Sequence, residues 1–140
     1  MVRQQLLFKS SMLNSNQKTC FCGLGKSYQE CCEPIIKGVQ KAATAELLMR
    51  SRYSAYVTHQ ADYLLATTHV SKRSSHSKSE ILNWATNNKW LQLEIMHVTE
   101  YKVEFKAYFL DTKNLQQIHH ELSSFILENQ NWFYVDGEFF

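Results

Sequence analysis

The sequence predicts an α+β fold in which helices come first and an antiparallel sheet follows. Helical spacing and helix-capping residues occur up to residue 88, whereas apolar and polar residues alternate from residue 90 onward. Short turn-forming stretches separate the alternating segments, which favours a meander of neighbouring strands. We therefore expect the helices to pack on one face of a curved sheet.

Three helices are predicted before the sheet, over residues 44–58 and 61–67 and in a segment that ends at residue 88. Thr44 carries the side-chain oxygen that an N-cap needs in order to accept a hydrogen bond from the first turn. Ser77 or Ser79 can do the same for the third helix. Residues 71–79 are polar and basic, which is typical of a loop.

Four strands are predicted in the second half of the chain, at residues 91–95, 103–109, 116–127 and 132–135. The second shows the pattern most clearly, because Val103 and Phe105 alternate with Glu104 and Lys106. Stretches rich in Asp and Asn predict turns at residues 111–114 and 129–131.

The composition is that of a folded, globular chain. It is 44% hydrophobic and 13% aromatic, and its 140 residues suit one compact domain. No segment approaches the roughly 18 consecutive apolar residues that a membrane span requires. The N-terminal apolar run is also too short for a signal peptide. We therefore expect a soluble, cytoplasmic protein without a membrane span.

All four cysteines, Cys20, Cys22, Cys31 and Cys32, fall within one short segment. Two close pairs joined by a loop suit the tetrahedral coordination of zinc by thiolates. A disulfide framework would spread its cysteines along the chain, and a bridge between adjacent cysteines would be strained. An iron–sulfur cluster uses the same ligands, but this spacing is not a common cluster pattern. The sequence therefore predicts one structural zinc ion.

The N-terminal part of the chain is mildly basic. Residues 1–41 contain six lysines and arginines and two glutamates, and the net charge of the whole chain is +2. Metal-bound thiolates would offset part of the local excess. The remaining charge is too small to predict nucleic-acid binding.

The pattern Cys-x-Cys-Gly-x-Gly-Lys-x-Tyr-x-x-Cys-Cys over residues 20–32 resembles the SEC-C motif, the zinc knuckle at the C-terminus of the SecA translocation motor. Later strings are similar to YchJ-type proteins, namely LMRSRYSAY (48–56), DYLLATTH (62–69) and WFYVDG (132–137). Phe21 and Leu24 depart from the usual knuckle, where proline and serine are common. Neither position provides a metal ligand, so these two substitutions leave the ligand set unchanged and make the surface of the knuckle more apolar.

This resemblance implies a nuclear transport factor 2-like cone, in which helices pack into a strongly curved sheet, and it implies no established activity. It divides the chain into a flexible lead-in (1–17), a zinc knuckle (18–38) and the α+β domain (39–140). The SecA knuckle contacts protein partners and the ribosome, so we expect an interaction or adaptor module that binds a protein partner. The alternative is a small-molecule binder or an enzyme that uses the cone-shaped pocket.

Arg52 is the unusual residue of the longest predicted helix. It lies in the middle of an apolar stripe formed by Ala45, Leu48, Met49, Tyr53 and Tyr56. A buried charge needs a partner. Arg52 is therefore expected either in a structural ion pair or in a polar pocket, with Glu121 as the first partner and Asp136 as the second. Arg50 lies off the stripe and is expected in solvent.

The candidate pocket residues of the cone are Arg52, Tyr56, His69, His120 and Glu121. His119 and His120 are neighbours on a strand and must face opposite sides, so only one can enter the cone. A structural histidine is the simpler interpretation of either. Trp84 and the other large aromatic residues are expected in the core. No nucleophile–base spacing names a reaction, which favours a role other than catalysis.

Overall fold

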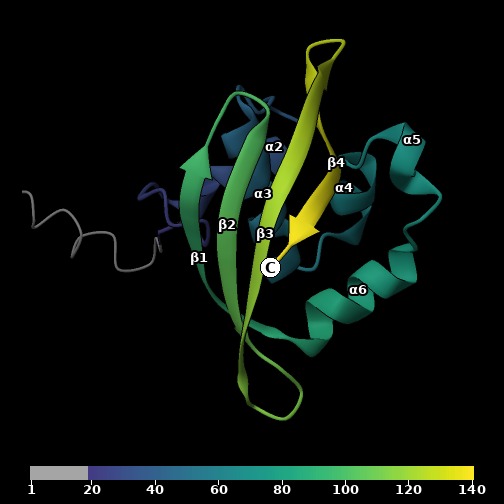
Figure 1. Cartoon of the computed structure of the whole chain (residues 1–140). Coiled ribbons are helices and arrows are strands. Elements are labelled where there is room, and N and C mark those ends of the chain that lie inside the picture. Colours follow the sequence, from purple (N-terminus) through teal and green to yellow (C-terminus); the bar gives the residue numbers. More distant parts are fainter. Residues whose placement is uncertain (1–18) are drawn as a thin grey trace, which may run out of the picture.

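A computed structural model describes residues 19–140, and the predicted lead-in over residues 1–17 lies outside the described residues. The chain forms helices first and then a four-stranded sheet (Figure 1). This confirms the predicted α+β class. Within residues 19–140, no helix is long and apolar enough to cross a membrane.

The helical part contains more short elements than predicted. Its elements are η2 (Tyr28–Glu30), α2 (Cys32–Ile36), α3 (Ala45–Val57), α4 (Ala61–Ala66), α5 (Val70–Arg73) and α6 (Lys78–Asn87). Thr44 caps α3 by accepting a hydrogen bond from the Leu47 N–H, and Ser77 caps α6 by accepting one from the Glu80 N–H. The predicted loop over residues 71–79 is wrong in part. His69 accepts a hydrogen bond from the Ser71 N–H and so caps α5.

The sheet is an antiparallel meander in the order β1-β2-β3-β4. Its strands are β1 (Lys89–Val98), β2 (Lys102–Leu110), β3 (Gln116–Glu128) and β4 (Asn131–Phe139). Asn129 and Gln130 both have positive φ, so the β3–β4 hairpin turns through two left-handed residues whose twist matches that of the strands. The last strand extends beyond the predicted segment and brings Phe139 opposite Glu121.

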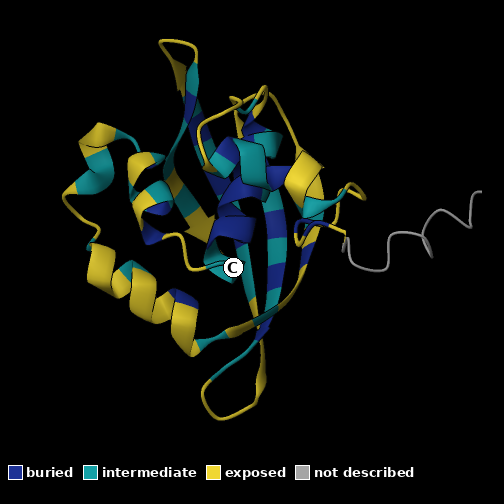
Figure 2. Ribbon diagram, turned by 180° about the vertical axis from the view of Figure 1, so that it is seen from behind, coloured by how far each residue is buried: buried dark blue, intermediate teal, exposed yellow. Residues whose placement is uncertain are grey.

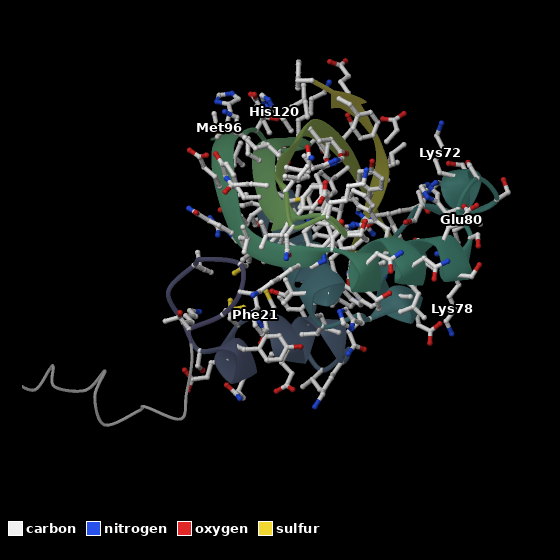
Figure 3. The ribbon with its side chains drawn as sticks, turned by 90° about the horizontal axis from the view of Figure 1, so that it is seen from below. Phe21, Lys72, Lys78, Glu80, Met96 and His120 are labelled. Carbon is white, nitrogen blue, oxygen red and sulfur yellow. The ribbon has the colours of Figure 1, made fainter. Side chains whose placement is uncertain are left out.

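Irregularities in pairing bend the sheet around the helices. The register shifts between Trp90 and Gln92, between Ile95 and His97, and between Ser124 and Phe125. An extra residue in one strand bends that strand and increases its twist. Figure 3, seen along this curvature, shows the strands wrapping around a space that holds many side chains.

The buried core lies between α3 and the concave face of the sheet. Figure 2 shows α3 as largely buried and α6 as largely exposed. The Arg52 stripe does face the core, because Leu48, Met49 and Tyr53 are all buried. The four cysteines belong to the same apolar cluster as these α3 residues. The cysteine segment therefore packs directly on the helix that covers the sheet.

Candidate metal centre and cone cavity

The side chains of Cys20, Cys22, Cys31 and Cys32 converge on one point. All are buried, and their four sulfur atoms lie within 4.8 Å of one another. The Sγ atoms of Cys22 and Cys31 are 3.7 Å apart, and those of Cys31 and Cys32 are 4.0 Å apart. A disulfide would need about 2.05 Å. The cluster therefore consists of free thiols arranged so that they could hold a metal ion.

The loop between the two cysteine pairs has the geometry that its glycines allow. The Cys20 N–H donates to the Lys26 carbonyl at 2.7 Å, and Thr19 forms a β-bridge with Ser27. Gly23 and Gly25, which lie inside this reversal, have φ values of +82° and +106°. Residues with a Cβ adopt these angles only with strain. The loop thus returns the chain so that η2 and α2 can present the second cysteine pair.

The thiols of Cys20, Cys31 and Cys32 differ in how readily they ionise. Hydrogen bonds from Cys22 and Cys32 hold the pKa of the Cys20 thiol far below its usual range. Burial raises the pKa of Cys31 to about 12, and the hydrogen bond that Cys32 donates to Cys20 raises the pKa of Cys32. One thiolate is therefore stabilised by neighbouring thiols. A bound divalent cation would replace their protons, because thiolates and not thiols ligate metals.

Arg50 connects α3 to the cysteine segment through a hydrogen bond that was not predicted from the sequence. Its Nη1 atom donates to the Cys22 carbonyl at 2.6 Å, and its Nε atom donates to Glu46 at 2.9 Å. The Arg50 side chain is only 13% exposed, so the expectation that it lies in solvent is wrong. The spacing of Glu46 and Arg50 by four residues was the available signal for an oriented side chain. Its long-range acceptor could not be read from the sequence.

We expect Arg50→Gln to loosen the knuckle. The lost charged hydrogen bond should lower the free energy of unfolding by about 1–2 kcal/mol. It should also speed the loss of metal to a chelator, which can be followed with a metallochromic dye. The matched control is Arg73→Gln, because Arg73 also donates to backbone carbonyls, those of Thr68 and Ala66, but away from the knuckle. Equal rates of metal loss in the two variants would contradict this role.

A cavity of about 220 Å³ lies between α3, α6 and the concave face of the sheet. Its polar lining includes Arg52, Tyr53, Tyr56, His119 and Glu121. Its apolar lining includes Met49, Ile81, Trp84, Trp90, Phe105 and Phe139. Trp84, predicted to lie in the core, is instead 42% exposed, which places it at the mouth. The cavity combines an apolar wall with a small number of buried polar groups, as ligand pockets do.

Glu121 is the buried acceptor of this cavity. Its carboxylate accepts hydrogen bonds from His119 Nε2 at 2.8 Å, Ser123 Oγ at 2.7 Å and Tyr134 Oη at 2.8 Å. Burial alone would raise the pKa of Glu121, but these donors outweigh it and hold the pKa below its ordinary value. A Cβ atom at position 137 would collide with the Glu121 carboxylate, so Gly137 makes room for the side chain.

Arg52 is buried, but its predicted ion pair is absent. Its Nη1 atom donates to the Leu64 carbonyl at 2.9 Å and to Thr67 Oγ1 at 2.7 Å. Within residues 19–140, no carboxylate lies within 4.0 Å of it, and this corrects the expected pairing with Glu121 or Asp136. The guanidinium instead stacks 4.6 Å from the centre of the Tyr134 ring. Because Tyr134 also donates to Glu121, the two charges are joined through this tyrosine.

His69 and His120 are the pocket histidines expected from the sequence, but the structure places neither of them in the cavity. His119 lines the cavity, whereas His120 lies on the outer side of the sheet, 2.7 Å from Glu104 (Figure 3). His69 lies beside Glu128, with 3.1 Å between Nε2 and Oε1, away from the cavity. The pairing of Lys106 with His120 and of Ala107 with His119 explains the correction. Placing the hairpin turn between residues 110 and 116 would have revealed this register.

These features define a class of protein: a nuclear transport factor 2-like domain with a SEC-C-type cysteine cluster packed on its first long helix. Residues 44–137 match the family model for the middle, nuclear transport factor 2-like domain of YchJ. The chain belongs to the YchJ family, which confirms the resemblance found in the sequence.

Relatives and solved structures agree with this membership. UPF0225 proteins from Geobacter sulfurreducens and Serratia proteamaculans are 41% and 42% identical over 125 residues, covering 84% of this chain and 77% and 81% of theirs. The solution structure of a SEC-C motif containing protein from Rhodopseudomonas palustris matches with a TM-score of 0.78 and 34% identity, over 85% of this chain and 96% of that one. The crystal structure of such a protein from Psychrobacter arcticus gives 0.75 and 33%, over 85% and 81%.

Proposed function

We propose that the protein binds one zinc ion through Cys20, Cys22, Cys31 and Cys32, and that the metal shapes the knuckle for contact with a partner protein. The observation that supports zinc is the spacing of the sulfurs. A tetrahedral site with zinc about 2.3 Å from each sulfur has edges of about 3.8 Å. The Cys22–Cys31 and Cys31–Cys32 sulfur separations, 3.7 Å and 4.0 Å, lie close to that value, and all four sulfurs lie within 4.8 Å of one another. Four thiolates leave no open coordination position, so the ion has a structural and not a catalytic role.

The knuckle exposes an apolar surface beside a positive charge. Phe21 and Leu24 are 41% and 40% exposed, and Lys26 is exposed on the same loop. Figure 3 labels Phe21 beside the cysteine sulfurs, and its ring packs edge-on against Tyr28, with ring centroids 5.2 Å apart. A rigid aromatic residue on a surface loop is a common anchor in protein interfaces. The partner that fits is a protein segment with apolar residues next to an acidic one.

We expect the double variant Phe21→Ser, Leu24→Ser to lose this partner. Affinity capture from lysate of the source cells, with wild type and variant compared by mass spectrometry, measures it. Val39→Ser is the matched control, because Val39 is more exposed than either residue, at 82%, and lies outside the cysteine loop. All three proteins should retain zinc. A partner captured equally by all three would contradict binding through Phe21 and Leu24.

The second function that we propose is the binding of a small molecule in the cone cavity. Three groups from two elements support it, because Arg52 and Tyr56 on α3 and Glu121 on β3 line one cavity with apolar walls. Structural ion pairs in cores are usually packed without such a space. No group in the cavity has the arrangement of a nucleophile with its base, so we propose binding and not catalysis.

A further inference from the structure

We infer that the cone cavity selects a small carboxylic acid whose apolar part is about the size of one aromatic ring. This inference deepens the second function proposed above and depends on it. It rests on an imbalance between hydrogen-bond donors and acceptors along the cavity wall. The Glu121 carboxylate is largely satisfied within the protein, whereas N–H groups of Arg52 and two tyrosine hydroxyls have no protein partner in the described part of the chain.

Glu121 has little capacity left for a ligand. A carboxylate offers about four acceptor positions, and His119, Ser123 and Tyr134 occupy three of them. The backbone of Gly137 closes against the same carboxylate. A ligand that offers donors, such as an amine, therefore finds at most one free position on this carboxylate.

Two tyrosines of α3 have hydroxyls without protein partners among the described residues, and each hydroxyl can donate a hydrogen bond to a carboxylate. Tyr53 is 3% exposed, and neither its hydroxyl nor that of Tyr56 makes a hydrogen bond within residues 19–140. In this part of the chain, Ser27 Oγ is the fully enclosed side-chain polar atom that lacks a partner. The tyrosine hydroxyls are therefore not sealed in the core. The open space that both residues line is the cavity.

Arg52 adds a positive charge and further donors. Within the described residues, every hydrogen bond of Arg52 is donated by its Nη1 atom, to Leu64, Thr67 and Thr68. The Nε and Nη2 atoms carry three of the five N–H groups of a guanidinium and have no acceptor within residues 19–140. Arg52 is 7% exposed and lines the cavity, so the space that these donors can reach is the cavity. A carboxylate supplies the planar pair of oxygens that such a fork binds.

The size and charge of the cavity further limit the class of ligand that it can bind. An engineered cavity of about 150 Å³ holds benzene, so about 220 Å³ has room for one ring and a short acidic group. Trp84, Trp90 and Phe105 provide the faces for that ring. A monoanion suits the site better than a phosphate dianion, because the Glu121 carboxylate shares the cavity with Arg52.

The test compares phenylacetate with phenylacetamide and phenethylamine, which share one ring and differ in the charge of the polar end. Binding is measured on the full-length, zinc-loaded protein by calorimetry and by the fluorescence of Trp84 and Trp90, at millimolar ligand concentrations. We expect phenylacetate to bind at least about tenfold more tightly than the amide, since a hydrogen bond to a charged group is worth at least that ratio. Phenethylamine should show no binding.

Two matched tyrosine variants separate binding from folding. Tyr53→Phe removes a hydroxyl without a protein partner, so its melting temperature should stay equal or rise, while phenylacetate binding weakens about tenfold. Tyr63→Phe removes a hydroxyl that lies 2.7 Å from Ser51 Oγ outside the cavity, so it should lose stability and keep binding. Arg52→Met should abolish the preference for the acid over the amide.

The outcomes distinguish small-molecule binding in the cavity from selection of a carboxylic acid. Equal binding of acid and amide, with changes in tryptophan fluorescence, would overturn selection of a carboxylate and leave small-molecule binding standing. Failure of every probe to bind at millimolar concentration would overturn both. Weakening by Tyr63→Phe to the same extent as by Tyr53→Phe would show that the tyrosine effect arises from folding, and would also overturn the inference.

Discussion

Replacing Cys31 with serine is expected to abolish stoichiometric zinc binding while most of the α+β domain stays folded. Wild type should contain about one zinc per chain, since structural zinc sites bind with an apparent free energy on the order of 10–16 kcal/mol. A three-thiolate site lacks one of the four ligands that hold the ion. Elemental analysis of protein purified without chelator measures the metal, and circular dichroism measures the fold.

The stability of this variant should nevertheless fall. The cysteines contact the apolar cluster that contains Leu48 and Met49, so an open knuckle uncovers part of α3. Ser54→Ala is the control, because Ser54 Oγ lies 3.5 Å from Cys20 Sγ but is not a predicted ligand. It should keep its zinc. Collapse of all secondary structure in Cys31→Ser would contradict the division at residue 39, and full zinc content would contradict the four-cysteine site.

Glu121→Gln is expected to destabilise the protein by about 3 kcal/mol at neutral pH, the low end of the range for breaking a buried charge arrangement. The change weakens the three hydrogen bonds that converge on the carboxylate. It also removes the negative charge from the cavity that Arg52 lines. Urea unfolding monitored by circular dichroism provides the measurement.

The pH dependence of this difference has a definite sign. The folded-state pKa of Glu121 is lowered, so its stabilising contribution is complete above its unfolded pKa, which is about 4.3. It disappears as the pH falls through the lower, folded pKa. The gap between wild type and Glu121→Gln should therefore be constant near neutral pH and close below about pH 4.

The control for this prediction is Glu104→Gln. Glu104 also lies 2.7 Å from a histidine, His120, but on the outer side of the sheet. Both side chains are half-buried at the surface. Surface pairs contribute about 0–1 kcal/mol, so this variant should unfold nearly as wild type does. A loss of similar size in both variants would mean that the buried position of Glu121 has no special importance.

Several parts of this architecture follow from local sequence alone. Thr44 and Ser77 have the side chains that cap helices, and both do so. The alternation in residues 103–109 predicts a strand with Val103 and Phe105 buried, as observed. The spacing of the cysteines predicts their convergence, because a short loop with glycines can adopt the backbone angles that turn the chain back. These features depend on interactions between residues close together in the chain.

The sequence by itself therefore determined the fold class, the order of the main helices and strands, and the cysteine cluster. Only the tertiary structure decided which distant side chains meet: Arg50 with the Cys22 carbonyl, Tyr134 between Arg52 and Glu121, and His119 rather than His120 in the cavity. The physical reason is that such contacts depend on strand register, on the bends at bulges and on where α3 crosses the sheet. Periodicity specifies which face a residue occupies, but not which residue lies opposite.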